Sequence, residues 1–340
     1  MPAREPGPPR RFPAAPARTG RAECRTSSVA IARAARNETS LTDRSTILYV
    51  TDLAYQAPGR RYCDEDIGLS ERLRGPFAVA LCHPKDVVTL MDGFDAVVVR
   101  NCGPGWQYDA SFGAVRERAL NAGARVYNTP SGKADMAGKQ YLLDLYARGY
   151  PVIPTVERVD ELDRLPHSER YLVKPKTGAD SRGIEILTAR DLARADRAFD
   201  GLLIQPLIDF AYEVSFYFID GALQYALYAP RPAERWKLER YEPTPADAAF
   251  ARRFIAWNAL AHGIQRVDAC RTRGGELLLV EVEDHNPYLS LDLLDDAARE
   301  AFVANLTASL RRLLADEPAV ARPGPGSAVA RAEHPSAAGD

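Results

Sequence analysis

The stretch RVDACRTRGGELLLVEVEDHNPYLS, residues 266–290, combines a predicted hairpin with an unusual density of acidic side chains. Two apolar segments flank Gly274 and Gly275, which predicts two paired strands. Four of its carboxylates, Asp268, Glu281, Glu283 and Asp284, lie close to the apolar run of Leu and Val. Crowded like charges repel, and a buried unpaired carboxylate is costly. We therefore expect something positive among them, either a metal ion or an arginine, with water as the remaining alternative.

Length and composition place the chain among ordinary globular proteins. It has 340 residues, 46% hydrophobic and 26% charged, with a formal net charge of −2. One large domain or two to three small ones are expected. The near-neutral charge argues against a nucleic-acid partner bound through its phosphates. No apolar run reaches the roughly 18 residues of a membrane span, so no membrane partner is expected either.

The cysteines and the chain ends suggest where the protein works and which parts fold. Five scattered cysteines without CxxC spacing fit reduced thiols in a cytoplasmic protein better than disulfides or a zinc site. Residues 1–44 are rich in Arg, Pro and Ala and are predicted to be a disordered extension; a transit peptide or a translation start further downstream are the alternatives. Residues 317–340 are predicted to be a disordered tail.

Residues 45–130 alternate short apolar strands with helices. Four strands are expected, at 46–52, 77–82, 95–101 and 124–128, with helical periodicity between them. Strands that alternate with helices indicate a parallel sheet covered on both faces. We therefore predict a small doubly wound α/β domain over this range.

Residues 131–316 follow a different pattern. A helix over 136–149 precedes the strands 170–176 and 184–187, and 213–229 reads as a hairpin that turns at Asp220-Gly221. A long amphipathic helix then leads to the acidic hairpin, and a last helix is predicted over 294–316. This range is expected to form a second domain.

Two segments of the second domain suit a nucleotide. Lys174 ends an apolar strand and is followed by the turn TGADSRG, whose backbone N–H groups can bind phosphate. Gln205 and Leu207 belong to an apolar linker that can contact an adenine edge, and Glu213 can accept hydrogen bonds from ribose hydroxyls. The alternatives are a solvated strand-end lysine and an ordinary strand connection with a surface glutamate.

Taken together and in order, these motifs resemble the ATP-grasp ligases, the superfamily of D-alanine–D-alanine ligase, prokaryotic glutathione synthetase and the RimK-like peptide ligases. The pattern Arg-x-Asp, hairpin, then Glu-x-Asn appears here as Arg266, Asp268, Glu281 and Glu283. Asn128 precedes Lys139 by 11 positions, as in the glutathione-synthetase segment that carries the first ATP lysine. The motifs VKP, IQPLI and YEVS complete the resemblance, which spans residues 46 to about 315.

The resemblance implies an α/β architecture, the ATP-grasp fold with an N-terminal doubly wound pre-ATP-grasp domain, and ATP between two subdomains of residues 131–316. The residues it assigns to ATP are Lys139, Lys174, Gln205, Leu207 and Glu213. It assigns Mg²⁺ or Mn²⁺ to Asp268 and Glu281, with either Glu283 or Asn286 completing the site.

The resemblance also implies residues on the substrate side. Arg100, at a strand end, is expected to hold a substrate carboxylate, the alternative being a surface arginine. Arg235 and Lys237 are expected to bind the phosphate or the intermediate, and Arg266 to stabilise an oxyanion. His285 is expected to form local hydrogen bonds rather than act as a base.

The function so implied is an ATP- and Mg²⁺-dependent, ADP-forming ligase that joins a carboxylate to an amine through an acyl phosphate. Its expected partners are small, amino-acid-like carboxylate and amine substrates, and a homodimer is possible. The segment HNPYLSL lacks the Ser-Pro-Gly run of the D-alanine ligases, which argues against a cell-wall dipeptide ligase. Two alternatives stay open, a nucleotide-binding regulatory module without turnover and a small-molecule phosphotransferase.

Overall fold

The computed structural model describes most of the chain between the two predicted tails. The described residues are 44–57, 60–100, 108–178, 183–194, 199–231, 234 and 237–316. The tails predicted at 1–44 and 317–340 fall outside this set except for residue 44, and so does Arg235.

The N-terminal part contains a parallel sheet of four strands in the order β4-β1-β5-β6. Its strands are β1 (Thr46–Val50), β4 (Ala78–Cys82), β5 (Ala96–Val99) and β6 (Val126–Tyr127). The helices between them are α1 (Tyr62–Leu73), α2 (Val87–Leu90), a 3₁₀ turn (Met91–Gly93) and α3 (Asp109–Asn121), and a short hairpin joins β2 (Gln56–Ala57) to β3 (Arg60–Arg61). The predicted parallel sheet and its alternation with helices are confirmed.

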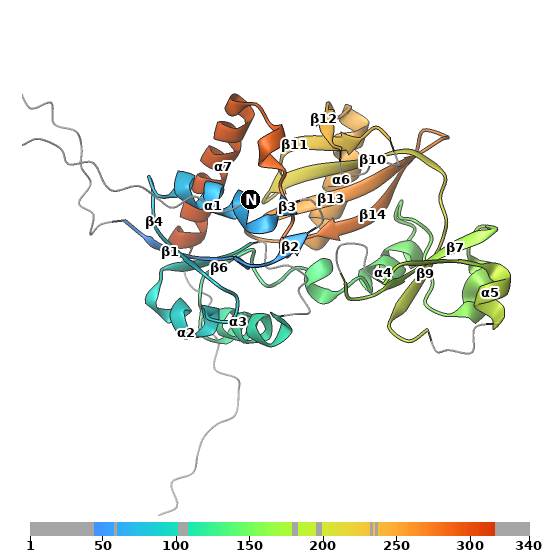
Figure 1. Ribbon diagram of the computed structural model, residues 1–340, viewed down its shortest axis with the longest axis horizontal. Helices are drawn as coiled ribbons and strands as arrows, with labels where there is room; N and C mark the ends of the chain where they lie inside the picture. The colour runs from blue at the N-terminus through green and yellow to red at the C-terminus, as the bar shows by residue number, and fades with distance from the viewer. Residues whose placement is uncertain are drawn as a thin grey trace, which may run out of the picture. The chain divides into compact units, whose positions relative to one another are not determined.

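Side-chain alternation along β1 explains why both faces of this sheet are covered. Ile47 and Tyr49 pack with residues of α1 and α7, whereas Leu48 and Val50 pack with residues of α2 and α3. All four are at most 1% exposed. Because successive strand residues point to opposite faces, a strand buried on both sides carries an unbroken apolar run. Figure 1 shows α1 and α7 on one side of the sheet, with α2 and α3 on the other.

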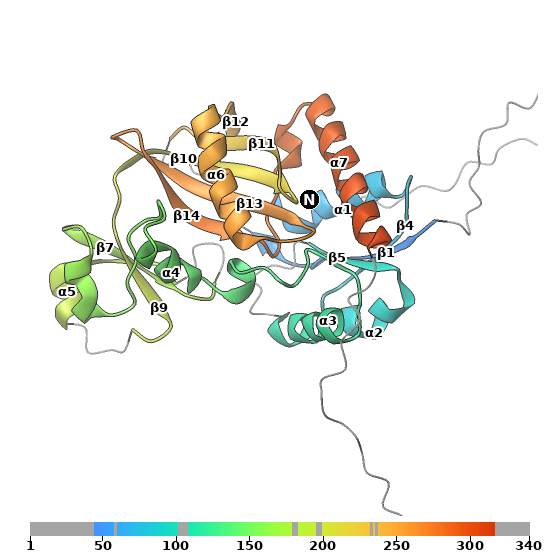
Figure 2. The ribbon, with the colours of Figure 1, turned by 180° about the vertical axis from the view of Figure 1, so that it is seen from behind.

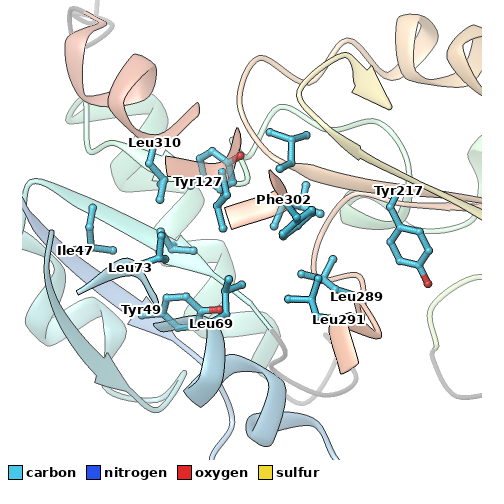
Figure 3. Packing of buried hydrophobic residues seen from close by; sticks show 14 of the residues in the cluster. Ile47, Tyr49, Leu69, Leu73, Tyr127, Tyr217, Leu289, Leu291, Phe302 and Leu310 are labelled. Carbon is cyan, nitrogen blue, oxygen red and sulfur yellow. The ribbon is translucent and has the colours of Figure 1, made fainter. Parts of the chain in front are cut away.

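The helix α7 (Asp296–Ala315) comes from the far end of the chain and completes this N-terminal core. Phe302, Leu306 and Leu310 are at most 1% exposed and belong to the same apolar cluster as Ile47 and Leu73 (Figure 3). A division of the chain by sequence order alone does not reveal this packing, because the contacting residues lie more than 220 positions apart.

Residues after 130 form two antiparallel sheets. The smaller, in the order β8-β7-β9, contains β7 (Arg170–Pro175), β8 (Glu185–Thr188) and β9 (Leu202–Pro206). The larger, in the order β12-β11-β10-β13-β14, contains β10 (Phe210–Ile219), β11 (Ala222–Ala229), β12 (Glu239–Tyr241), β13 (Ile264–Thr272) and β14 (Leu277–Glu283). Both predicted hairpins are present, and their turns use positive φ at Asp220 (53°) and Gly275 (89°).

The helices of this part are shorter than expected at one important place. They are α4 (Tyr141–Ala147), α5 (Ala189–Arg194) and α6 (Pro245–Asn258), with 3₁₀ turns at Asp135–Ala137, Val159–Arg164 and Leu291–Leu293. The predicted helix 136–149 begins only at Tyr141, because Gly138 has a φ of 86°, a left-handed conformation that interrupts a helix. Lys139 therefore lies in the loop before α4, where its N–H donates to the carbonyl of Lys176 at 2.8 Å.

Side chains of the large sheet alternate between a face that packs with α6 and an opposite face that carries acids beside the cavity. Val214, Phe216 and Val267 pack with α6, which lies across the sheet in Figure 2. The alternation of side chains then directs Glu213 and Asp268 to the opposite face. The same rule applies to β14, where Val282 packs with α6 residues and its neighbours are acidic. Strand geometry thus separates the acids from the core beneath them.

No helix in the described ranges is both long enough and apolar enough to cross a membrane.

Replacing Phe302 tests the contribution of α7 to the N-terminal core. Phe302→Ala should lower the free energy of unfolding by about 3 to 5 kcal/mol, the usual cost of truncating a buried phenylalanine. Glu300→Ala, at an exposed position of the same helix, should change it by less than about 0.5 kcal/mol. Denaturant unfolding of both variants measures the difference, and equal effects would contradict the packing described.

Candidate nucleotide and metal site

A cavity of about 350 Å³ lies against the small sheet and the large sheet, a size that suits a small ligand. All five residues predicted to bind ATP line it: Lys139, Lys174, Gln205, Leu207 and Glu213. Much of the remaining lining is apolar and comes from Ile153, Leu172, Ile184, Ile186, Phe210 and Val280. The predicted residues come from separate segments of the chain, and the fold brings them to one place.

Lys139 connects this cavity to the acidic hairpin. Its side chain is 10% exposed, and Nζ contacts Asp135 Oδ1 at 3.1 Å and Glu281 Oε2 at 2.5 Å. Burial alone would lower the pKa of Lys139, but the two carboxylates raise it well above its usual value. Burial would raise the pKa of Glu281, yet Lys139 and Lys174 bring it down to about 2. This lysine and this glutamate are therefore both charged at neutral pH.

Lys174 is less well compensated than Lys139. It is 7% exposed at the end of β7, and burial lowers its pKa to about 8 while Glu281 opposes the shift. A buried ammonium held this weakly favours an incoming anion. Lys176, two residues further on, differs because its ammonium pairs with Glu157.

Gln205 and Leu207 both form hydrogen bonds within the protein. Gln205 is 3% exposed, and its Nε2 donates to Thr155 Oγ1 at 2.8 Å, which fixes the side chain. The N–H of Leu207 donates to the carbonyl of Arg170 at 2.9 Å. This backbone amide is therefore already bonded within the small sheet. Leu207 contributes its side chain, which is 37% exposed, to the cavity.

Asp268, Glu281 and Glu283 form the group of acids that the sequence predicts as metal ligands. Each offers one oxygen, and these oxygens all lie within 4.8 Å of one another. Strand register explains the arrangement, since Asp268 pairs with Glu281 and Arg266 pairs with Glu283 across β13 and β14. Oxygen ligands from several carboxylates are what Mg²⁺ and Mn²⁺ prefer. The donor set therefore fits a hard divalent cation.

Arg266 supplies the positive charge within the acidic hairpin. Its Nε donates to Asp268 Oδ1 and its Nη2 to Asp268 Oδ2, both at 2.8 Å, and Nη2 also donates to Glu283 Oε1 at 2.6 Å. Burial would lower the pKa of Arg266, but the two acids raise it well above its usual value. The positive groups among the acids are therefore the side chains of Arg266 and Lys139.

Two carboxyl groups still lack full compensation. Burial raises the pKa of Asp135 to about 7 and that of Glu283 to about 8, and in both cases the neighbouring cations only partly oppose the shift. Such shifts mark a place with more carboxylates than the local cations can neutralise. A divalent cation would remove this surplus, which is a second reason why the site fits a metal.

Asp284, the fourth acid of the hairpin, serves the structure instead. It is fully buried and accepts hydrogen bonds from Ala134 N (3.1 Å), Met136 N (2.8 Å) and Asn258 Nδ2 (3.0 Å). It therefore holds the loop that leads to Lys139. A Cβ on Gly132 would lie 2.2 Å from Asp284 Oδ2, so glycine is required for this approach.

Asn286 and His285 follow β14 and do not belong to the group of three acids. Of the two alternatives predicted to complete the metal site, Glu283 is in the group of three acids, and a role for Asn286 stays a prediction. The ring of His285 meets Phe112 edge-on at 4.5 Å, and burial lowers the pKa of its imidazole to about 4.

Arg100 is enclosed rather than exposed at a crevice. Its side chain is 0% exposed, and it pairs with Glu65 and Asp66, both at 3.4 Å. We expected it to face a substrate, but these two acids of α1 lie over the end of β5 and pair with it instead. Its contact with a substrate carboxylate stays a prediction.

Lys237 is not brought to the cavity. Its side chain is 56% exposed and pairs with Glu234 at 2.5 Å. Arg235, the other residue predicted for this role, lies outside the described residues. The phosphate- or intermediate-binding role of both stays a prediction.

Tyr141 and Asp135 complete the site and were not anticipated. Tyr141 Oη accepts from the N–H of Val282 at 2.7 Å, so the first turn of α4 is joined directly to β14. Asp135 lies four residues before Lys139 and pairs with it. This acid–lysine spacing was visible in the sequence, whereas the tyrosine gave no signal.

The fold and the cavity together define a class: the chain has the ATP-grasp fold, and its structural neighbours are ATP-grasp ligases. No protein-family model matches the chain. Among curated proteins, the cycloserine biosynthesis protein DcsG of Streptomyces lavendulae is 26% identical, over 64% of this chain and 84% of its own length.

Solved structures show the same likeness. The D-cycloserine synthetase DcsG matches with a TM-score of 0.63 and 24% identity, over 79% of this chain and all of its own. The D-alanine–D-alanine ligase of Bacillus anthracis, complexed with ATP, matches with 0.58 and 15%, over 79% and 97%. The ligase PsnB, complexed with a precursor variant, Mg and ADP, matches with 0.54 and 18%, over 78% and 100%. The predicted fold is confirmed.

The structural role of Asp284 can be tested without any ligand. Asp284→Asn should lower the free energy of unfolding by about 3 kcal/mol, because an amide NH₂ would face N–H donors and leave them unsatisfied. Asp292→Asn, at an exposed position nearby, should cost less than about 0.5 kcal/mol. Thermal unfolding compares the two, and a stable Asp284→Asn protein would show that this carboxylate does not hold the 134–136 loop.

Proposed function

We propose that the protein is an ATP- and Mg²⁺-dependent ligase that joins a carboxylate to an amine and forms ADP. One observation carries the proposal: Glu281 both lines the cavity and belongs to the three-acid group. A nucleotide in the cavity would therefore extend its phosphates toward the acids. The homologues and structural neighbours of the chain are ATP-grasp ligases, which supports the same reaction class.

Asp268, Glu281 and Glu283 would hold Mg²⁺, or Mn²⁺, and such an ion would neutralise phosphate charge and polarise the transferred phosphoryl group. Lys139 and Lys174, which lie beside Glu281, would contact the ATP phosphates. The apolar lining and Gln205 would enclose the adenine, and Glu213 would accept from the ribose. Lys139, Gln205 and the acids are held by the contacts described above, and such preorganisation is what electrostatic stabilisation of a transition state requires.

The chemistry needs no covalent attachment to the protein. A substrate carboxylate oxygen attacks the γ-phosphorus, the bond to ADP breaks, and an acyl phosphate forms. The amine then attacks the acyl carbon, phosphate leaves, and the amine loses a proton. Arg266 would stabilise the oxyanion formed in that step. Burial raises the pKa of Cys82 to about 11 and that of Cys270 to about 12, so neither thiol suits nucleophilic catalysis.

The substrates we propose are small and amino-acid-like. Support comes from the likeness to the cycloserine biosynthesis protein and to the D-alanine–D-alanine ligase, whose names refer to small molecules. The contributions of Arg100, Arg235, Lys237 and Asn286, the cytoplasmic location and a possible homodimer stay predictions.

Release of ADP and phosphate, measured with pools of amino acids, tests the reaction class. A ligase releases both products only when a carboxylate and an amine are present together. ADP without free phosphate would indicate a phosphotransferase. Nucleotide binding without any release would indicate a binding module, and either result would overturn the proposal.

The acids can be separated from the fold in the same assay. Asp268→Asn and Glu281→Gln should each abolish turnover, because a divalent cation loses a ligand, while thermal unfolding stays cooperative. Added Mn²⁺ should not restore the wild-type rate. Near-normal turnover in both variants would rule out the assignment of a metal to this group.

Lys174 has a natural control two residues away. Lys174→Ala should weaken ATP binding or phosphoryl transfer by about 2 to 4 kcal/mol, because a charge stabiliser in a water-poor site is lost. Lys176→Ala, whose ammonium pairs with Glu157, should change either by much less. Adenosine, which lacks phosphates, should bind the wild type and both variants equally in calorimetry. Unchanged ATP affinity and rate in Lys174→Ala would make this lysine a strand-end charge only.

A further inference from the structure

The peptide group between Tyr288 and Leu289 is held from both sides. Its carbonyl accepts a hydrogen bond from Arg266 Nη1 at 3.0 Å, and its N–H donates to Glu65 Oε1 at 2.9 Å. Because a peptide unit is planar and rigid, whatever orients the N–H also orients the carbonyl. Glu65, on α1, is therefore linked through one rigid unit to the guanidinium that contacts the acids.

Glu65 holds more than one group in this segment. Its Oε2 also accepts from Leu291 N at 3.1 Å, so a single carboxylate holds the N–H groups on both sides of Ser290. Ser290 is 3% exposed and has a φ of 53°, a left-handed conformation that serine adopts only at a cost. Tyr225 Oη fixes the same turn by donating to the carbonyl of Leu289 at 2.7 Å. The hydrogen bonds to Glu65 thus stabilise the left-handed backbone conformation of Ser290.

Arg100 provides the counter-charge that keeps Glu65 in place. The carboxylate of Glu65 is 5% exposed and lies 3.4 Å from Arg100 Nη2. Arg100 and the two N–H donors oppose the effect of burial, which still raises the pKa of Glu65 to about 7. Asp66, next along α1, also contacts Arg100, but its oxygens accept from Tyr49 Oη at 3.0 Å and Thr51 Oγ1 at 2.6 Å, within the N-terminal sheet.

At the other end of the link, Arg266 touches two of the three proposed metal ligands. Its bidentate contact with Asp268 and its bond to Glu283 set where those carboxylate oxygens lie. Besides the two carboxylates, this guanidinium contacts the Tyr288 carbonyl through a hydrogen bond and the Tyr217 ring, whose centroid lies 5.9 Å from Cζ. If the Tyr288 carbonyl shifted, the guanidinium of Arg266 would lose this anchor, and the positions of Asp268 and Glu283 would no longer be fixed by it.

We propose that Glu65 is a positioning residue for the metal site, acting through the 288–289 peptide on Arg266 and thereby on Asp268 and Glu283. This inference rests on the proposed function, because it presumes that the three acids bind a divalent cation. It assigns to the N-terminal helix α1 a part in metal binding, although α1 contributes no ligand. Mutation of residues that orient metal ligands from behind typically lowers metal affinity by about 10- to 100-fold.

Glu65→Gln tests the proposal in the full-length protein. The amide keeps the shape of the side chain, but its NH₂ would face one of the two N–H donors, so only one can stay bonded. The probe is AMPPNP, a non-hydrolysable ATP analogue, titrated by calorimetry with and without Mg²⁺. We expect metal-free affinity within about twofold of wild type, and an apparent Mg²⁺ affinity of the nucleotide complex lowered by about 10- to 100-fold.

Asp66→Asn is the matched control, with the same chemical change one residue away and the same contact with Arg100. It should lower thermal stability at least as much as Glu65→Gln yet leave the apparent Mg²⁺ affinity within about threefold of the wild-type value. An equal loss of Mg²⁺ affinity in both variants would mean that the buried charge cluster acts through general stability, and the proposal would be overturned.

A second variant keeps the test decisive if Glu65→Gln does not fold. Glu65→Asp retains the charge but is one methylene shorter, so it cannot reach both N–H groups, and it should show the same selective loss. Failure of the inference and failure of the proposed function are distinguishable. If the AMPPNP affinity of the wild-type protein does not depend on Mg²⁺, the proposed function is contradicted. If it does depend on Mg²⁺ and the Glu65 variants keep the wild-type Mg²⁺ affinity, only the role of Glu65 is contradicted.

Discussion

Three carboxylates on two neighbouring strands repel one another unless cations lie between them, and the rest of the site follows from this constraint. Arg266 reaches two of the acids from their own hairpin, and Lys139 reaches Glu281 from a loop about 140 residues earlier. Both cations are buried and both hold their protons firmly. The hairpin therefore requires the loop before α4 at its edge, and the cavity forms where the two meet.

The alternation of β-strand side chains decides which acids gather beside the cavity and which bond to the backbone. Glu281 and Glu283 share the face of β14 that lies opposite α6, whereas Val282 packs with α6. Asp284 comes after the strand has ended, and its carboxylate accepts backbone N–H groups from the loop that leads to Lys139. One acid thus places the lysine that neutralises another. Function and stability are coupled here through the backbone.

Much of the fold and of the cavity lining was predictable from the sequence, because both depend on local patterns. Strand–helix alternation predicts the parallel sheet, and short motifs predict Lys174 and Glu213 at the cavity. Long-range pairing was not predictable in this way. Nothing near Arg100 in the sequence indicates that Glu65 and Asp66 enclose it, since the partners are about 35 positions apart on different elements. For the same reason, the sequence did not predict that α7 packs into the N-terminal core.

An edge strand is an unusual place for a site that needs fixed geometry, because its outer N–H and carbonyl groups lack a neighbouring strand. In β14 these groups are satisfied by other parts of the chain: Leu279 exchanges hydrogen bonds with Pro151 and Ile153, and the N–H of Val282 bonds to Tyr141. The segment after the strand is held by Glu65 from α1. Each contact comes from a different element, so the acids of β14 are positioned only when those elements have all packed. The site therefore depends on the completed fold, including α1, which lies far from β14 in the sequence.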